Sequence, residues 1–201
     1  MRILGISGSL RRDSHNSRLL RAAARSLPPG EVLEPYDGLA SLPPFNEDLE
    51  LEPPAHVVRW QEAIAGADAL LFSTPEYNAS IPGWLKNAVD WASRPFPDNV
   101  MRDRPAGVIG TSTGLFGAVW AQAELRKVLR YAGAHVLDEE LPVPTADLAF
   151  SPDDDLLVPE LGQRLRELLE ALAREAAAPL ETAGPRPAPP QPAAAPAVAR
   201  T

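Results

Sequence analysis

Five short apolar runs, each followed by a segment with helically spaced apolar residues, constrain the fold of this chain more than any other feature. The expected strands are residues 2–7, 31–36, 68–74, 106–111 and 135–138. The expected helices are residues 16–27, 56–65, 81–92 and 116–132, and a last helix with Pro159 in its first turn. This alternation predicts an α/β domain in which a parallel sheet is covered by helices on both faces.

Right-handed crossovers leave few ways to order five parallel strands in one sheet. The strand count favours the doubly wound, flavodoxin-like order 2-1-3-4-5. In such a sheet, ligands bind beyond the carboxyl ends of the strands, near the point between strands 1 and 3 where the winding direction changes. The loops after the first, third and fourth strands are therefore the places to look for a site.

The end of the 201-residue chain differs in composition from the rest. Residues 179–201 contain seven prolines and seven alanines and almost no large apolar side chains. Such a segment cannot bury enough apolar surface to offset the entropy of ordering, so we expect a disordered or polyproline-like tail. The expected organisation is one flavodoxin-like domain at residues 1–178 followed by this tail, with a tail that binds a partner as an alternative.

Composition excludes several classes of function. The chain has no cysteine, which excludes disulfides, thiolate catalysis and cysteine-bound zinc or iron–sulfur clusters. Its three histidines are scattered, and its net charge of -8 argues against nucleic-acid binding, which needs basic faces. No apolar run approaches the roughly 20 residues needed to cross a bilayer, and the N-terminus lacks the features of a signal peptide. We therefore expect a cytoplasmic protein that binds neither nucleic acid nor membrane.

The loop after the first strand, residues 8–17, combines small, hydroxyl and basic residues. A helix begins near its end, and a helix N-terminus offers unpaired N–H groups and a partial positive charge. Hydroxyls and a guanidinium would complete a cradle for a phosphate, although neither GxxxxGK[ST] nor GxGxxG is present. The alternative is a helix cap with surface arginines, because Ser14 or Asn16 would cap the helix in either case.

The loop after the third strand begins with Pro75, which keeps Thr74 extended. The residues that follow can aim backbone N–H groups and one aromatic ring, that of Tyr77, at a flat ligand. The alternative is a stiff turn into the next helix, with Tyr77 only at its rim.

The loop after the fourth strand, residues 110–114, matches GxSxG, the nucleophile elbow of serine hydrolases. An elbow serine at Ser112 needs an acid and then a histidine later in the chain. Only His135 follows, at the start of an expected strand, and the sole acid between them is Glu124, within a helix. We therefore prefer a glycine- and hydroxyl-rich loop that lets a ring lie against the backbone, and a serine hydrolase remains an alternative.

Taken together, the three loops resemble the NADPH-dependent FMN reductase family, which includes quinone, azo-dye and chromate reductases. The resemblance covers about residues 2–175 and rests on Gly8-Ser9-Leu10-Arg11 with Ser14 and Asn16, Pro75-Glu76-Tyr77-Asn78, Gly110-Thr111-Ser112-Thr113-Gly114, Leu42-Pro43-Pro44-Phe45-Asn46 with Asp48, and Lys86-Asn87-Ala88-Val89-Asp90-Trp91. One departure concerns the loop after the fourth strand, which commonly continues G-G-x-R. Here Gly117 is followed by Ala118-Val119-Trp120, and the missing arginine bears on subunit contacts or substrate shape.

The resemblance implies non-covalent FMN and assigns its binding residues by position. The phosphate would be held by Ser9, Arg11, Ser14 and Asn16. The ring would be lined by Pro75, Glu76, Tyr77 and Asn78, with Ser112, Thr113 and Gly114 on its other edge. Family members are usually homodimers or homotetramers, so we expect the same of this chain.

The expected reaction is hydride transfer from NADPH or NADH to FMN, and then from the flavin to a quinone-like, azo or other small acceptor. Both transfers use one face of the ring, so the kinetics should be ping-pong, and no side chain is required as a catalytic acid or base. We interpret Glu76 as a motif acid with its carboxylate in solvent, and Arg12 and Arg94 as candidates for contact with a 2′-phosphate. A flavin-binding electron carrier without efficient NAD(P)H turnover is the leading alternative.

Overall fold

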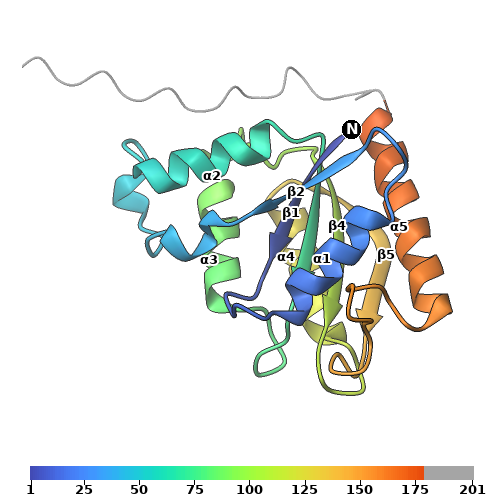
Figure 1. Ribbon diagram of the computed structural model, residues 1–201. Coiled ribbons are helices and arrows are strands. Elements are labelled where there is room, and N and C mark those ends of the chain that lie inside the picture. Colours follow the sequence, from blue (N-terminus) through green and yellow to red (C-terminus); the bar gives the residue numbers. More distant parts are fainter. Residues whose placement is uncertain (179–201) are drawn as a thin grey trace, which may run out of the picture.

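The computed structural model describes residues 1–178, and at their centre lies a five-stranded parallel sheet of order β2-β1-β3-β4-β5 (Figure 1). Its strands are β1 (Arg2–Ser7), β2 (Val32–Tyr36), β3 (Ala69–Thr74), β4 (Pro105–Thr111) and β5 (His135–Val143). All four strand pairs are parallel. The predicted flavodoxin-like topology is confirmed, whereas the tail predicted at 179–201 lies outside the described residues.

Five helices cover the two faces of the sheet. They are α1 (His15–Arg25), α2 (Ala55–Ala65), α3 (Gly83–Ala92), α4 (Val119–Tyr131) and α5 (Pro159–Ala177). Leu19 of α1 and Leu165 of α5 pack with Leu71 of β3 on one face. Helices α2, α3 and α4 pack on the other face, so each βα crossover carries the chain to one of the two layers.

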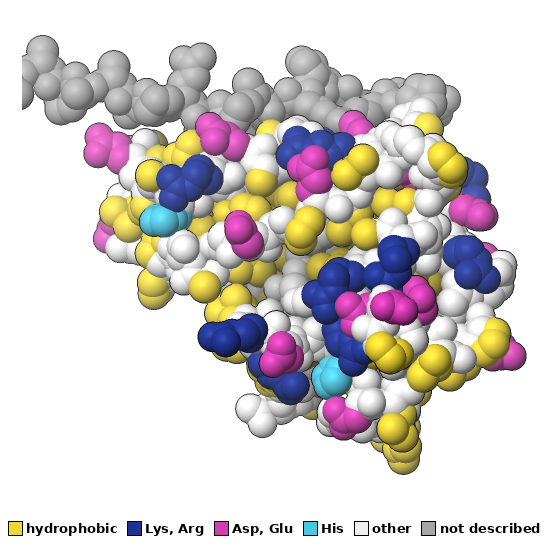
Figure 2. All heavy atoms as spheres, viewed as in Figure 1, with side chains coloured by type: hydrophobic (Ala, Val, Ile, Leu, Met, Phe, Trp, Pro, Cys, Tyr) yellow, Lys and Arg dark blue, Asp and Glu magenta, His cyan; other side chains and the backbone are white. Residues whose placement is uncertain are grey.

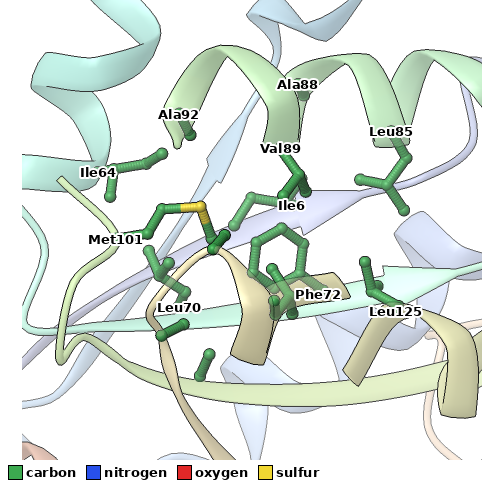
Figure 3. Packing of buried hydrophobic residues seen from close by; sticks show 14 of the residues in the cluster. Ile6, Ile64, Leu70, Phe72, Leu85, Ala88, Val89, Ala92, Met101 and Leu125 are labelled. Atoms are coloured by element: carbon green, nitrogen blue, oxygen red, sulfur yellow. The ribbon is translucent and has the colours of Figure 1, made fainter. Parts of the chain in front are cut away.

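The core on the α3 side is built around Phe72 of β3. Figure 3 shows its ring below α3, close to Val89 and Leu85, with Leu125 of α4 on the same side of the sheet. All four side chains are buried. This packing fixes the start of α3 against the end of β3, which is where the loop predicted to line a ligand lies.

Two boundaries differ from those predicted by three residues or more, and one predicted loop contains short helical turns. The fifth strand runs on to Val143, because its register shifts opposite Ala106 and Val108 and pairing then continues beside β4. Helix α4 begins three residues late, since Gly117 and Ala118 adopt positive φ values of 58° and 63°. The long loop after β2 contains two 3-10 turns, η1 (Gly38–Ser41) and η2 (Glu47–Leu49).

Residues 1–178 contain neither a helix suited to spanning a membrane nor a cluster of metal-binding side chains. None of the helices there combines the length and the apolar character needed to cross a membrane. The same residues contain no group of three histidine or acidic side chains that could hold a metal ion.

Candidate functional site

The loops after β1 and β3 are joined at the carboxyl edge of the sheet. The backbone N–H of Gly8 donates to the Ser73 carbonyl at 2.8 Å, and the indole N–H of Trp84 donates to the Gly8 carbonyl at 2.7 Å. A Cβ at position 8 would lie 2.9 Å from Leu85 and 3.1 Å from Pro75, so only glycine fits here without displacement. Trp84 was not anticipated from the sequence, because its helical spacing indicates only a core position.

The loop after β1 leaves several backbone donors available to a ligand. Ser14 is the N-cap of α1, and its hydroxyl accepts from the N–H groups of Asn16 and Ser17 at 3.1 and 3.4 Å. Within residues 1–178, no acceptor is found for the backbone N–H groups of residues 12, 13 and 15. Free N–H groups at the first turn of a helix are suited to an anion.

Two side chains of the same loop, Arg11 and Ser9, are also accessible to a ligand. Arg11 is exposed, and its guanidinium forms no hydrogen bond or ion pair within the described residues. Ser9 is half-buried, and its hydroxyl accepts from the Arg11 backbone N–H at 3.4 Å. The geometry of both residues agrees with a phosphate cradle at the N-terminus of α1.

Asn16 is placed differently from Arg11, because its side chain is only 3% exposed. Its Nδ2 donates to the Thr111 carbonyl at 3.1 Å, and its Oδ1 accepts from the Ser73 hydroxyl at 2.9 Å and from the Thr111 N–H at 3.2 Å. One side chain thus joins the start of α1 to the ends of β3 and β4. We interpret Asn16 as a residue that positions the cradle from behind, more than as a direct phosphate ligand.

The interpretation of Glu76 as a solvent-facing acid is wrong. Its Oε2 accepts hydrogen bonds from the backbone N–H groups of Trp120 and Ala121, at 3.1 and 3.2 Å. Helix α4 needs this contact, because its N-cap residue Ala118 has no side-chain acceptor. The Ser80 hydroxyl donates to Glu124 at 2.6 Å, so two contacts bind this loop to α4.

The tip of the loop after β3 is a tight turn that presents Tyr77. Tyr77 and Ser80 pair through both backbone hydrogen bonds, and Asn78 and Ala79 between them have φ values of 53° and 60°. The Tyr77 ring is exposed and lies edge-on to Trp84, with centroids 5.8 Å apart. Pro75 is buried beneath the turn, whereas Asn78 is exposed. The backbone N–H groups of Asn78 and Ala79 have no acceptor among residues 1–178, so a flat ligand can meet the Tyr77 ring and these donors.

The loop after β4 is fixed through its carbonyl groups, whereas two of its backbone N–H groups remain unbonded. The carbonyls of Ser112 and Gly114 accept from the N–H groups of Ala146 and Thr145 at 3.0 and 3.1 Å. The N–H groups of Thr113 and Gly114 have no acceptor among residues 1–178 and are free to meet a ligand. Backbone donors therefore line this side of the site as well.

The geometry does not favour a serine hydrolase. His135 begins β5 at the opposite edge of the sheet and pairs with Glu175 at 3.2 Å. The histidine nearer to the site is His15, whose Nε2 lies 3.1 Å from Asp147. In the described part of the chain, the recorded partners of the two rings are Asp147 and Glu175, and neither ring forms a hydrogen bond with Ser112. The pairing of His15 with Asp147 could not be predicted from the sequence, because Asp147 lies far away along the chain.

Two exposed aromatic side chains lie next to the Tyr77 turn. Phe116 and Trp120 lie with their ring centroids 5.1 Å apart, and both are more than half exposed. Trp120 is tied to Glu76 through its backbone N–H, so this aromatic pair adjoins the Tyr77 turn. Arg94, a candidate for contact with a 2′-phosphate, follows the far end of α3 and stacks on Phe45 with 5.3 Å between guanidinium and ring centroid.

These features fit a phosphorylated ring compound such as FMN. The free N–H groups at the start of α1 suit the phosphate, and the free N–H groups of the other two loops suit the polar edge of the ring. The glycine at position 8 and another at position 110 bring the backbones together; a Cβ at 110 would lie 2.7 Å from the Thr74 carbonyl.

Comparisons with known proteins agree with this fit. The family described as NADPH-dependent FMN reductase matches residues 1–147. An NAD(P)H-dependent FMN reductase of Pseudomonas aeruginosa is 43% identical over 174 residues, which is 86% of this chain and 93% of that protein. An NADPH:quinone oxidoreductase of Arabidopsis thaliana is 36% identical over 181 residues, 86% of this chain and 90% of that protein. The solved structure of FerB, an NAD(P)H:acceptor oxidoreductase of Paracoccus denitrificans, has a TM-score of 0.77 and 32% identity, and the match covers 87% of this chain and 96% of that one. The chain belongs to the NADPH-dependent FMN reductase family.

Proposed function

We propose that this enzyme passes hydride from NADPH or NADH through FMN to quinone-like, azo or other small acceptors in a ping-pong cycle. The observation that carries the proposal is a set of unbonded backbone N–H groups. They belong to the three loops after β1, β3 and β4, at the carboxyl edge of the sheet. FMN, when bound, supplies the chemistry of accepting and then donating a hydride. The chain supplies binding and orientation.

Each loop has its own task in this proposal. The start of α1 and Arg11 hold the phosphate through charge-assisted hydrogen bonds. The Tyr77 turn and the N–H groups of Thr113 and Gly114 orient the ring. Glu76 keeps the Tyr77 turn against α4, so the ring-binding surface is fixed before a ligand arrives. Such prior ordering reduces the entropy lost on binding.

A flat aromatic acceptor suits the exposed aromatic pair Phe116 and Trp120. Offset or edge-on contacts between aromatic rings stabilise a complex by about 0.5–1.5 kcal/mol beyond the area they bury. The names of two relatives, the Arabidopsis oxidoreductase and a 2-hydroxy-1,4-benzoquinone reductase of a Burkholderia species that is 44% identical over 131 residues, favour a quinone. We therefore propose a quinone as the preferred acceptor.

We also propose that the enzyme is a homodimer or homotetramer that works in the cytoplasm, where NAD(P)H is supplied. A groove of about 670 Å³ between α3 and α4 supports self-association. Phe96 and Tyr131 beside it are 66% and 88% exposed, and large exposed apolar side chains of this kind are typical of interfaces. Sedimentation velocity on the purified chain tests this proposal, and a single monomer species at micromolar concentration contradicts it.

Two measurements test the reaction. The absorption spectrum of the purified protein, before and after loading with FMN, reports whether FMN binds and is released on denaturation. Steady-state oxidation of NADPH and NADH with and without a benzoquinone then reports turnover. A protein that binds FMN but is reduced only very slowly by both donors would be an electron carrier instead. Parallel lines in double-reciprocal plots at several quinone concentrations are expected for the ping-pong cycle.

A further inference from the structure

A second cavity lies beside the phosphate loop, on the side of the sheet that α1 covers. Its volume is about 410 Å³, which lies within the range of small-molecule sites. Along α1 it is lined by Ser17, Leu20, Arg21 and Ala24, and not by the first-turn residues whose N–H groups are free. The Arg21 guanidinium is already paired with Asp154, at 2.7 Å. The groove is therefore distinct from the phosphate cradle, although Ser9 borders both. Figure 2 shows this face of the molecule hollowed at its centre, with a hydrophobic floor in yellow.

The walls of the groove combine apolar surface with one free acid. Leu33 and Pro35 of the edge strand β2 and Leu39 of η1 form apolar walls. Asp37 follows β2 directly and lines the same groove. Its carboxylate is exposed and forms no hydrogen bond or ion pair within residues 1–178. An aromatic base fits the apolar walls, and a neighbouring carboxylate is suited to accepting hydrogen bonds from hydroxyl groups.

An acid at the end of the second strand of a β-α-β unit is typical of sites that bind adenosine. β1 and β2 are parallel neighbours joined through α1, and Asp37 stands where the second strand of the unit ends. In dinucleotide-binding units, an acid at that place accepts hydrogen bonds from the ribose of the adenosine half. The glycine fingerprint that would bring a pyrophosphate onto the helix N-terminus is absent here, in keeping with a different phosphate at that position.

A series of contacts links the groove to the ring-binding loops. Contacts run from Tyr77 to the indole of Trp84, from this indole to the Gly8 carbonyl, and along the chain to Ser9, which borders the groove. A dinucleotide lying along this path would place its nicotinamide at the ring loops and its adenosine in the groove.

We propose that the groove between α1 and β2 binds the adenosine half of the NAD(P)H co-substrate, and that the Asp37 carboxylate accepts hydrogen bonds from its ribose hydroxyls. This proposal rests on the function proposed above and names a subsite of it. A consequence concerns the choice of co-substrate. A carboxylate at this place repels the 2′-phosphate of NADPH and binds the free hydroxyls of NADH.

The test compares donors with and without adenosine. In Ala40→Trp the indole fills the groove from an exposed position, and Ala55→Trp places the same indole at an exposed position outside it. We expect Ala40→Trp to raise KM for NADH about tenfold and to leave KM for reduced nicotinamide mononucleotide within about twofold. Ala55→Trp should change neither. Equal effects of Ala40→Trp on both donors, or no effect on either, would overturn the proposal.

Asp37→Asn tests the role of the carboxylate. The ratio of kcat/KM for NADPH to kcat/KM for NADH should rise about tenfold, since repulsion of the 2′-phosphate is removed and the bonds to the ribose are weakened. An unchanged ratio contradicts the assignment of Asp37. Because the amide keeps the size of the side chain, circular dichroism should show the same fold.

Calorimetric titration of the FMN-loaded chain with ADP-ribose separates this proposal from the reductase function. Binding that is lost in Ala40→Trp supports the groove, even if no donor is oxidised and the reductase function fails. The opposite result is that the chain oxidises NADH but binds ADP-ribose equally well in Ala40→Trp and Asp37→Asn. It would support the reductase function and contradict binding of adenosine in the groove.

Discussion

The Glu76 carboxylate caps helix α4 at Trp120: its Oε2 lies 3.1 Å from the Trp120 backbone nitrogen and 3.2 Å from that of Ala121. The acid comes from the loop after β3, and the helix it caps follows β4. This contact therefore joins two of the loops proposed to surround FMN. It also explains how α4 can begin directly after Ala118, an N-cap residue with a positive φ and no side-chain acceptor.

Glu76→Ala should destabilise the protein by about 1 kcal/mol and weaken FMN binding. The first loss is that of a helix cap, and the second follows because the Tyr77 turn is no longer held against α4. Urea unfolding of the apoprotein and FMN titration measure the two effects. Glu76→Gln is the matched control, because its carbonyl can still accept from both N–H groups. If Gln and Ala behave alike in both assays, the contact has no such role.

Arg11→Ala should weaken FMN binding by about 1.5–3 kcal/mol, which is roughly tenfold to 150-fold in Kd. A phosphate carries nearly two negative charges, and the chain as a whole has a net charge of -8, so a local cation is needed. Fluorescence titration with FMN measures the change. Arg166→Ala, an exposed arginine on α5, serves as the control for the loss of one positive charge. Equal affinities of the two variants would reject the cradle.

Ser112→Ala should lower NAD(P)H-dependent quinone reduction by less than about tenfold. The hydroxyl contributes at most one hydrogen bond of about 1 kcal/mol, while the neighbouring backbone N–H groups remain. A hydrolase would instead lose its ester hydrolysis by orders of magnitude. Wild type and variant are assayed side by side on a quinone with NADPH and on a short-chain nitrophenyl ester. Esterase activity that vanishes in the variant, without reductase activity in either protein, would overturn the reductase.

Asp154 should make stability depend on acid pH. Its burial raises the pKa of the carboxyl, but hydrogen bonds from Arg21, at 2.7 Å, and from Arg18 outweigh this and leave the pKa below its usual value. A carboxyl with a lowered pKa in the folded state stabilises that state above the pKa of the unfolded chain, about 3.9. The contribution is lost as the pH falls below that value towards the folded-state pKa.

Asp154→Asn should therefore reduce the free energy of unfolding by about 1 kcal/mol at pH 7. The difference from the wild type should shrink as the pH falls from about 5 towards 3. Asparagine tolerates the φ of 66° at this position, so the backbone is not the cause of the loss. Chemical unfolding at several pH values measures the difference, and a gap that stays constant with pH contradicts the electrostatic account.

A chain that ends at Ala178 should keep its fold, its oligomeric state and its reductase rate. Helix α5 ends at Ala177 and buries its leucines against the sheet before that point. The segment beyond it is rich in proline and alanine and has no apolar periodicity. Thermal unfolding, sedimentation and steady-state rates of the shortened chain check this prediction. A large fall in melting temperature or in oligomer size shows that the segment stabilises the protein.

The sequence by itself determined the architecture of this protein. The alternation of apolar runs with helically spaced residues predicted five strands and five helices, and the order β2-β1-β3-β4-β5 followed because right-handed crossovers leave few choices. It also placed the three loops at one edge, since the carboxyl ends of parallel strands must share an edge. These inferences succeed because periodicity and handedness are local properties of the chain.

Only the tertiary structure decided what individual side chains do at that edge. Glu76 faces a helix that begins more than forty residues later, Asn16 bonds to Thr111, and His15 pairs with Asp147. No periodic pattern encodes such contacts, because they depend on how far each crossover carries the chain and on which backbone groups remain unpaired. The same holds for Asp37. Its neighbours in sequence mark only a loop, and the groove it borders forms only where α1, β1, β2 and η1 come together in the fold.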